Sequence, residues 1–263
     1  MSFTAKDVQA LRQASGAGMM DAKKALEETG GDFDAAAKYL REKGLAKSVD
    51  RADRENAQGA VAVGSAAGRA ALVELKCETD FVAKSEQFLA VLDGILASVL
   101  ADGESGADAH KDAIDDLKVT LKENIELGRV AALPVADGQA VDTYLHKQEG
   151  RGVNGVLVVL DGGSEELAHE IAVSAAFSKP KYVTRDEVPA EAAAEERATL
   201  EGITRAEGKP EQAIEKIVEG RLNAWYKDQV LMEQGYAKDD KQSITQLLGD
   251  ATLAGFAQAY IGT

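Results

Sequence analysis

The hydrophobic periodicity of the chain changes at a charged segment, LAKSVDRADRENA, residues 45–57. Before this segment apolar residues recur at helical spacing, and after it they alternate or run together as they do in strands. The segment has no apolar period of its own, which is typical of a tether between folding units. The sequence therefore predicts a small helical domain (residues 1–46), a linker (residues 47–57) and a separate, larger domain.

The first 46 residues are predicted to form three short helices. Thr4 can cap the first helix, with Asp7 three residues on as an acidic variant of the capping box, and Val8 and Leu11 face inward. Glycines end the first two helices, and the third is predicted to run to Gly44. A bundle of this size has a thin core and marginal independent stability.

The larger domain shows one order of elements twice. GAVAVG and RAALVELKC predict a hairpin with its turn near residues 64–68, and a helix follows from Ser85. AVDTYLH and GVNGVLVVLDG predict a second hairpin, again followed by a helix, with Ser164 as its cap. We interpret this as a duplicated hairpin-plus-helix unit. It predicts an α+β core of two related subdomains, residues 58–139, and residues 140–188 together with 228–263.

A long helical pair, residues 189–227, interrupts the second subdomain and is broken at GKP, residues 208–210. Its apolar residues form a narrow stripe on otherwise charged helices: Leu200, Ile203, Ile214, Ile217, Val218 and Leu222. Such a stripe is typical of two antiparallel helices that project from a body, and it can also form a dimer surface.

Composition excludes several classes of function. The net charge of −15 argues against a protein that binds nucleic acid directly, whose footprint is basic. The single cysteine, Cys77, excludes an internal disulfide and a zinc site of several cysteines. The sequence shows no signal peptide and no stretch of about 18 apolar residues. These features predict a cytoplasmic protein that does not bind membranes.

Motifs for covalent chemistry are missing from the sequence. The three histidines, His110, His146 and His169, do not have the spacing of a metal pair, and no phosphate-binding glycine loop or nucleophile elbow occurs. Alternation along LVELKC favours a buried, structural Cys77. We therefore expect a protein that is not an enzyme and that uses no cofactor and no metal.

A few apolar residues stand in unusual places. In ELKCETDFVAK, residues 74–84, Asp80 and Phe81 occupy a strand-to-helix turn, where Gly, Asn or Ser is usual. The pattern alone favours a Phe81 that closes the core over one that faces outward. For Met19 and Met20, packing in the core and contact with a partner are equally favoured. For His146 a plain surface position is favoured.

Taken together, LRQASGAGMMDAKKAL and ELKCETDFVAK closely resemble the two signature segments of the bacterial elongation factor Ts family. The resemblance continues in order through ENIELGRVAAL, HKQEGRGVNGVLV, SAAFSKPKYV, GKPEQAIEKIVEGRL and SITQLL. It implies an N-terminal three-helix domain of the ubiquitin-associated (UBA-like) type and a core of two related subdomains with a projecting antiparallel helical hairpin. It also implies guanine nucleotide exchange on elongation factor Tu, in its GDP-bound and nucleotide-free states.

The resemblance further implies which residues act. It places Asp80 and Phe81 inside the partner's GTPase domain, where the aromatic ring displaces elements that hold the nucleotide. It implies partner contacts for a further set of residues: Thr79, Val82, Met19, Met20, Lys23, His146 and Leu121. Two positions depart from the family pattern, Lys122 where glycine is usual and Gly235 where proline is usual.

Two alternatives stay open at this point. One is a chaperone or scaffold that binds the same GTPase without opening its nucleotide site. The other is an enzyme with an unrecognised acid–base site. The chain keeps the Asp80-Phe81 pair, which favours exchange over the scaffold, and it lacks a cluster of His or Cys, which disfavours the enzyme.

Overall fold

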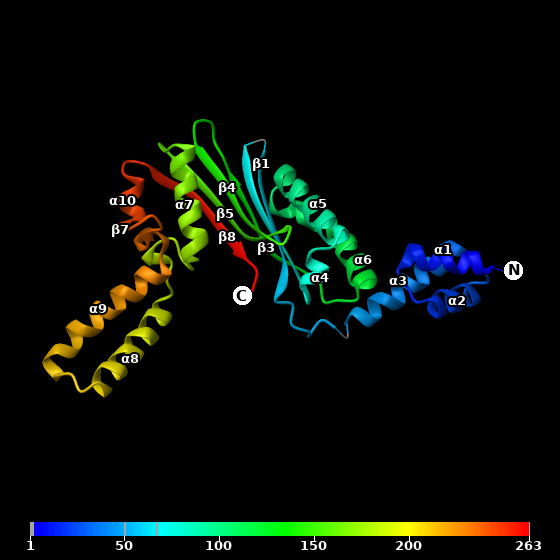
Figure 1. Ribbon diagram of the computed structural model, residues 1–263, viewed down its shortest axis with the longest axis horizontal. Coiled ribbons are helices and arrows are strands. Elements are labelled where there is room, and N and C mark those ends of the chain that lie inside the picture. Colours follow the sequence, from blue (N-terminus) through cyan, green and yellow to red (C-terminus); the bar gives the residue numbers. More distant parts are fainter. Residues whose placement is uncertain (1–2, 50, 67, 263) are drawn as a thin grey trace. The chain divides into compact units, whose positions relative to one another are not determined.

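The structure is a computed structural model that describes residues 3–49, 51–66 and 68–262. Asp50 of the predicted linker, Ala67 of the predicted hairpin turn and the terminal residues of the predicted domains lie outside the described residues. The chain divides into two compact units. Unit 1 comprises Met1–Ala132, Leu145–Gly155 and Ala259–Thr263, and unit 2 comprises Leu133–Tyr144 and Val156–Gln258. The predicted α+β class is confirmed (Figure 1).

Three helices form the N-terminal part of unit 1: α1 (Ala5–Ser15), α2 (Met19–Glu28) and α3 (Phe33–Val49). The predicted capping box is present, because Thr4 accepts a hydrogen bond from the Asp7 amide and Asp7 accepts one from the Thr4 amide. Their small core contains the two predicted inward residues of α1 and is mostly alanine and leucine: Val8, Leu11, Ala22, Ala25, Leu26, Ala36 and Leu40.

The third helix is longer than predicted, since α3 continues past Gly44 to Val49. A Cβ atom at Gly44 would lie 2.6 Å from a methyl group of Val119. Gly44 therefore allows close packing of α3 on α6 (Lys111–Leu121) and does not end the helix. The prediction of a helix end at Gly44 was wrong because a packing glycine and a terminating glycine look alike in sequence.

The rest of unit 1 is built around a sheet of order β1–β2–β3. Its hairpin is formed by β1 (Gln58–Ala66) and β2 (Arg69–Cys77), which pair antiparallel with Gln58 opposite Cys77. Helix α5 (Glu86–Asp102) packs on both strands (Figure 1) and contributes Phe88, Leu92, Ile95 and Val99 to the core. The other elements are α4 (Asp80–Ala83), a 3₁₀ helix (Glu104–His110), α6 and β3 (Glu126–Pro134).

A second sheet has the order β4–β5–β8, formed by β4 (Ala140–Gln148), β5 (Arg151–Asp161) and β8 (Thr252–Tyr260). The core of unit 2 joins β5 to α7 (Glu165–Ser178), through Val156, Val158 and Leu160 on the strand and Ile171 on the helix. As predicted, a hairpin is again followed by a helix. Smaller elements complete the unit: 3₁₀ helices Arg185–Glu187 and Leu231–Glu233, β6 (Gly235–Tyr236), β7 (Asp239–Ser243) and α10 (Ile244–Leu248).

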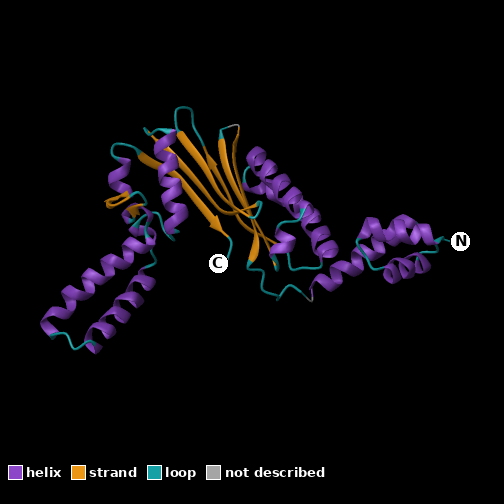
Figure 2. Cartoon of the chain, viewed as in Figure 1, coloured by secondary structure: helices purple, strands orange, loops and turns teal. Residues whose placement is uncertain are grey.

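The predicted helical pair is present in unit 2 as α8 (Ala190–Ala206) and α9 (Glu211–Gln229), which run side by side as a hairpin (Figure 2). Most of the apolar stripe on α9 is buried, including Ile214, Val218 and Leu222, whereas Ile203 on α8 is 46% exposed. The dimer surface on this hairpin and the limits of the subdomains stay predictions.

Candidate functional site

The chain passes from β2 into α5 through residues 78–85, which we call the first junction. Thr79 caps the four-residue helix α4, because its hydroxyl oxygen accepts a hydrogen bond from the Val82 amide. The helix predicted to start at Ser85 is present as α5, and Ser85 is its cap: it accepts a bond from the Phe88 amide, and its hydroxyl donates to the carbonyl of Val82. Two successive caps give this short segment a fixed course.

The aromatic ring of Phe81 faces solvent. Its side chain is 81% exposed, while Ala83 is fully buried and Val82 packs against the unit 1 core. The two inward residues of α4 are thus Val82 and Ala83, and they leave Phe81 on the outer face. The expectation that Phe81 closes the core was wrong. An exposed aromatic residue on an ordered turn is a candidate contact for another macromolecule.

Lys84 joins the first junction to the turn between β4 and β5. Its ammonium group lies 2.6 Å from a carboxylate oxygen of Asp80 and 2.7 Å from one of Glu149, and 5.6 Å from the centre of the Phe81 ring. The hydrogen bond from Lys84 lowers the pKa of Asp80, and the bonds to Asp80 and Glu149 raise the pKa of Lys84. Asp80 is therefore ionised and Lys84 charged near neutral pH.

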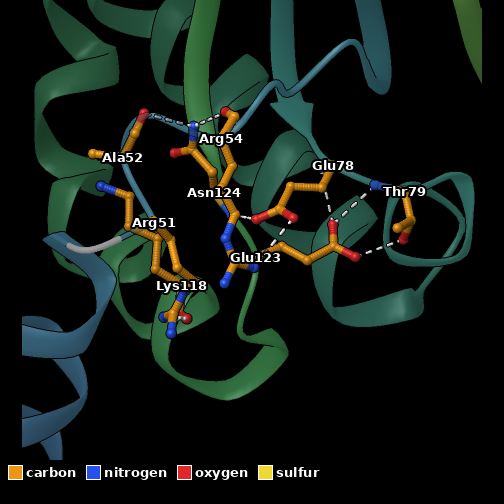
Figure 3. Close-up of polar contacts among 8 residues, drawn as sticks. All are labelled: Arg51, Ala52, Arg54, Glu78, Thr79, Lys118, Glu123 and Asn124. Atoms are coloured by element: carbon orange, nitrogen blue, oxygen red, sulfur yellow. Dashed lines mark hydrogen bonds and ion pairs between the residues drawn. The ribbon is translucent and has the colours of Figure 1, made fainter.

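Glu123, in the loop between α6 and β3, holds the start of the first junction (Figure 3). One of its carboxylate oxygens accepts from the backbone amides of Glu78 and Thr79, at 3.0 and 3.1 Å, and the other accepts from the Thr79 hydroxyl at 2.6 Å. The neighbouring Asn124 is buried and donates through its backbone amide to the carboxylate of Glu78. The first junction is thus braced from a loop that lies 45 residues away in sequence.

Cys77 is fully buried at the end of β2, as predicted. Burial raises the pKa of the Cys77 thiol to about 12, and the nearby carboxylate of Glu123 adds to the rise. A thiol that stays protonated is a poor nucleophile. It donates a hydrogen bond to the carbonyl of Thr79 and so belongs to the support of the first junction.

Three predicted contact residues lie together on α2. Met19 and Met20 are 48% and 73% exposed, and Lys23 is exposed and forms an ion pair with Glu27. The alternative in which both methionines fill the small core was wrong. Two exposed methionines one after the other form an apolar surface of the kind that can adapt to a partner.

The remaining predicted residues differ in exposure. His146 is exposed near the end of β4, which agrees with the surface position that its pattern favoured. Leu121 is half-buried and packs against the unit 1 core. Lys122 caps α6 with a left-handed backbone, φ 60°, the conformation for which glycine is usual. At Gly235 in unit 2 a Cβ atom would approach the carbonyl oxygen of Asp240 to 3.0 Å.

Every predicted contact residue belongs to unit 1: Met19, Met20, Lys23, Thr79, Asp80, Phe81, Val82, Leu121 and His146. Sequence reasoning missed the residues that support them, Glu78, Lys84, Glu123, Asn124 and Glu149. All five stand inside segments quoted above, ELKCETDFVAK, ENIELGRVAAL and HKQEGRGVNGVLV, but the contacts that join these segments span 44 to 65 positions and leave no local pattern. Among the described residues no helix is long and apolar enough to cross a membrane, and no three His, Cys, Asp or Glu side chains gather as a metal site.

An ordered junction that presents an aromatic ring, in the same unit as two exposed methionines, is typical of a protein that works through contact with another macromolecule. The family model "Elongation factor TS" matches residues 78–263. The chain is 46% identical to elongation factor Ts of Saccharopolyspora erythraea, over 99% of this chain and 98% of that protein. It is 43% identical to elongation factor Ts of Leifsonia xyli subsp. xyli, over 97% of each chain, and 42% identical to that of Clavibacter michiganensis subsp. michiganensis, over 99% of each chain. The chain belongs to the elongation factor Ts family, whose members are translation elongation factors.

Proposed function

We propose that this chain is a guanine nucleotide exchange factor for elongation factor Tu. It binds the GDP-bound GTPase and speeds GDP release by inserting Asp80 and Phe81 into the GTPase domain, after which GTP can load. The observation that carries the proposal is the position of Phe81, whose ring is 81% exposed on a junction held by two caps and by the Glu123 carboxylate.

A ring held in this way can act as a wedge without any covalent chemistry. Bound nucleotide depends on backbone amides and a magnesium ion in the GTPase, and displacing the loops that carry them weakens it. A factor shifts the partner toward this open state only by as much as it binds that state better. Burying one Phe side chain contributes about 1.5–3 kcal/mol, which corresponds to roughly 10- to 150-fold faster release if the contact forms only in the open state.

The other predicted contact residues fall into two groups, those that are exposed and those that pack against the core. Met19, Met20, Lys23 and His146 are exposed and provide a second area of contact with the GTPase. Val82 and Leu121 pack against the core, so in this proposal they set the position of the surface and contribute little to contact themselves. The scaffold alternative keeps all these contacts and omits only the opening of the nucleotide site.

The test is release of a fluorescent GDP analogue from purified elongation factor Tu, with the wild type, Phe81→Ala and Phe177→Ala. Phe177 is a matched control because it is 82% exposed and lies in unit 2. We expect the wild type and Phe177→Ala to accelerate release equally, and Phe81→Ala to accelerate it roughly 10- to 150-fold less. Binding of the wild type without faster release would support the scaffold and overturn the exchange function.

A further inference from the structure

We propose that Glu123 is the positioning residue of the first junction: its carboxylate sets the direction in which Asp80 and Phe81 leave the body of unit 1. The proposal rests on the exchange function and deepens it. It starts from three donors that converge on one side chain, the amides of Glu78 and Thr79 and the hydroxyl of Thr79 (Figure 3).

Glu123 acts where the sheet can no longer guide the chain. The pairing of β2 with β1 ends at Cys77, opposite Gln58, so the next two amides lie beyond the ladder. Glu123 accepts both of them through one oxygen. Backbone amides near a core need such a partner, and a carboxylate makes stronger hydrogen bonds than a neutral group.

The second oxygen of Glu123 acts on the helix that carries the wedge. It accepts from the Thr79 hydroxyl, whose oxygen in turn accepts from the Val82 amide and caps α4. Asp80 and Phe81 are the first two residues of that helix. The orientation of α4 relative to the end of β2 is therefore coupled to Glu123 through Thr79.

The loop that carries Glu123 is itself held in place. The Asn124 side-chain amide donates to the carbonyls of Ala52 and Arg54, at 3.1 and 2.8 Å, and its backbone amide donates to Glu78 at 2.7 Å. Arg54 also lies 3.4 Å from the Glu78 carboxylate. Glu78 and Glu123 thus each accept hydrogen bonds from the other's segment, and the linker closes the network (Figure 3).

The position of Asp80 and Phe81 affects the rate of GDP release more than it affects the affinity for the GTPase. A wedge displaced by about 1 Å can lose on the order of 100-fold in rate while most of the contact area is kept. We expect Glu123→Ala to lower the maximal rate of GDP release at saturating factor by about 10- to 100-fold, with a small change in the half-saturating concentration. Glu123→Gln, which keeps one acceptor oxygen, should lie between Glu123→Ala and the wild type. Glu55→Ala removes an equal charge at an exposed residue of the linker and should match the wild type.

The decisive experiment is a double-variant cycle in the full-length protein. If Glu123 acts through the wedge, Glu123→Ala lowers the maximal release rate in the wild type and leaves it unchanged in Phe81→Ala. An equal fold reduction in both backgrounds would show a general structural effect and overturn the proposal, as would a wild-type rate in Glu123→Ala.

Two further measurements keep the test decisive. Hydrogen exchange of the Glu78 and Thr79 amides should accelerate at least tenfold in Glu123→Ala. This result is expected whether or not the wild type is an exchange factor, so a failure of the exchange function can be told apart from a failure of the positioning role.

If Glu123→Ala does not fold, Thr79→Val takes its place. It removes the hydroxyl that couples Glu123 to α4, and Thr79→Ser should restore the release rate; a wild-type rate in Thr79→Val overturns the proposal.

Discussion

Two junctions in this molecule make the same change from strand to helix in different ways. The second junction, Gly162–Ser164, joins β5 to α7 through two glycines and a serine cap, and Gly162 takes the left-handed backbone (φ 71°) that glycine adopts freely. The first junction uses eight residues, an extra short helix and the carboxylate of Glu123. The second junction shows how little the fold needs at such a position. We propose that what the first junction adds serves the presentation of Asp80 and Phe81.

The largest expected contrast lies between two phenylalanines seven residues apart. Phe88 is fully buried in the unit 1 core, while Phe81 is exposed. Phe88→Ala should lower the free energy of unfolding by about 3–5 kcal/mol, because it removes a large buried side chain. Phe81→Ala should change it by less than about 0.5 kcal/mol.

Urea unfolding followed by circular dichroism measures both variants. Phe81→Ala should lose exchange activity while it keeps wild-type stability. A loss of stability above about 2 kcal/mol in Phe81→Ala would show that the ring packs in the core after all, and the comparison between the junctions would then fail.

Sequence patterns located the first junction but not the direction of its residues. The caps Thr4 and Ser164 and the helix start at Ser85 were predicted correctly, because capping depends on residue types close in sequence. The direction of Phe81 was predicted wrongly, because α4 is a single turn and four residues show no periodicity.

The support of the first junction could not be predicted for a different reason. Glu123 accepts from Thr79 across 44 positions and Lys84 reaches Glu149 across 65, so each contact exists only after the chain has folded. Glu149 also has a left-handed backbone, φ 52°, which its residue type does not indicate. The family resemblance supplied the predicted contact residues, and the structure adds the side chains that bond to their segment.

The two serine caps sharpen the comparison. Ser85→Ala and Ser164→Ala should each cost about 1 kcal/mol of stability, since each loses one hydrogen bond to a first-turn amide. Only Ser85 also donates to Val82 in α4. We therefore expect Ser85→Ala alone to lower the rate of GDP release. Thermal unfolding and nucleotide release measure the two effects, and equal release rates for the two variants would contradict a role of Ser85 in placing α4.

Replacing Lys122 with glycine is expected to stabilise the protein, a smaller effect that is opposite in sign to the loss of stability in the serine variants. Its backbone is left-handed, which costs a non-glycine residue roughly 1 kcal/mol. Lys122→Gly should remove this strain and, after the added entropy of the unfolded chain, raise the free energy of unfolding by a few tenths of a kcal/mol, up to about 1 kcal/mol. Gly162→Ala makes the reverse change at the second junction and should destabilise by about 1 kcal/mol. Chemical denaturation of both variants measures the sign of each change in the free energy of unfolding. A destabilised Lys122→Gly would show that the Lys122 side chain contributes more stability than its left-handed backbone costs.

The smallest effect concerns the charge beside the wedge. Lys84 lowers the pKa of Asp80, first through their hydrogen bond, so Lys84→Met should raise the pKa of Asp80 back toward its ordinary value. In the wild type the lowered pKa favours the folded state above the pKa of an unfolded aspartate, and this contribution is lost as the pH falls through the folded value. Lys84→Met should therefore flatten the dependence of stability on pH below about pH 4 and leave it unchanged near neutrality. Carbon-detected titration of the Asp80 carboxyl group measures the pKa directly. An unchanged pKa in Lys84→Met would mean that the Asp80 carboxylate is stabilised by its place at the start of α4 and not by the lysine, and Lys84 would then have no part in the difference between the two junctions.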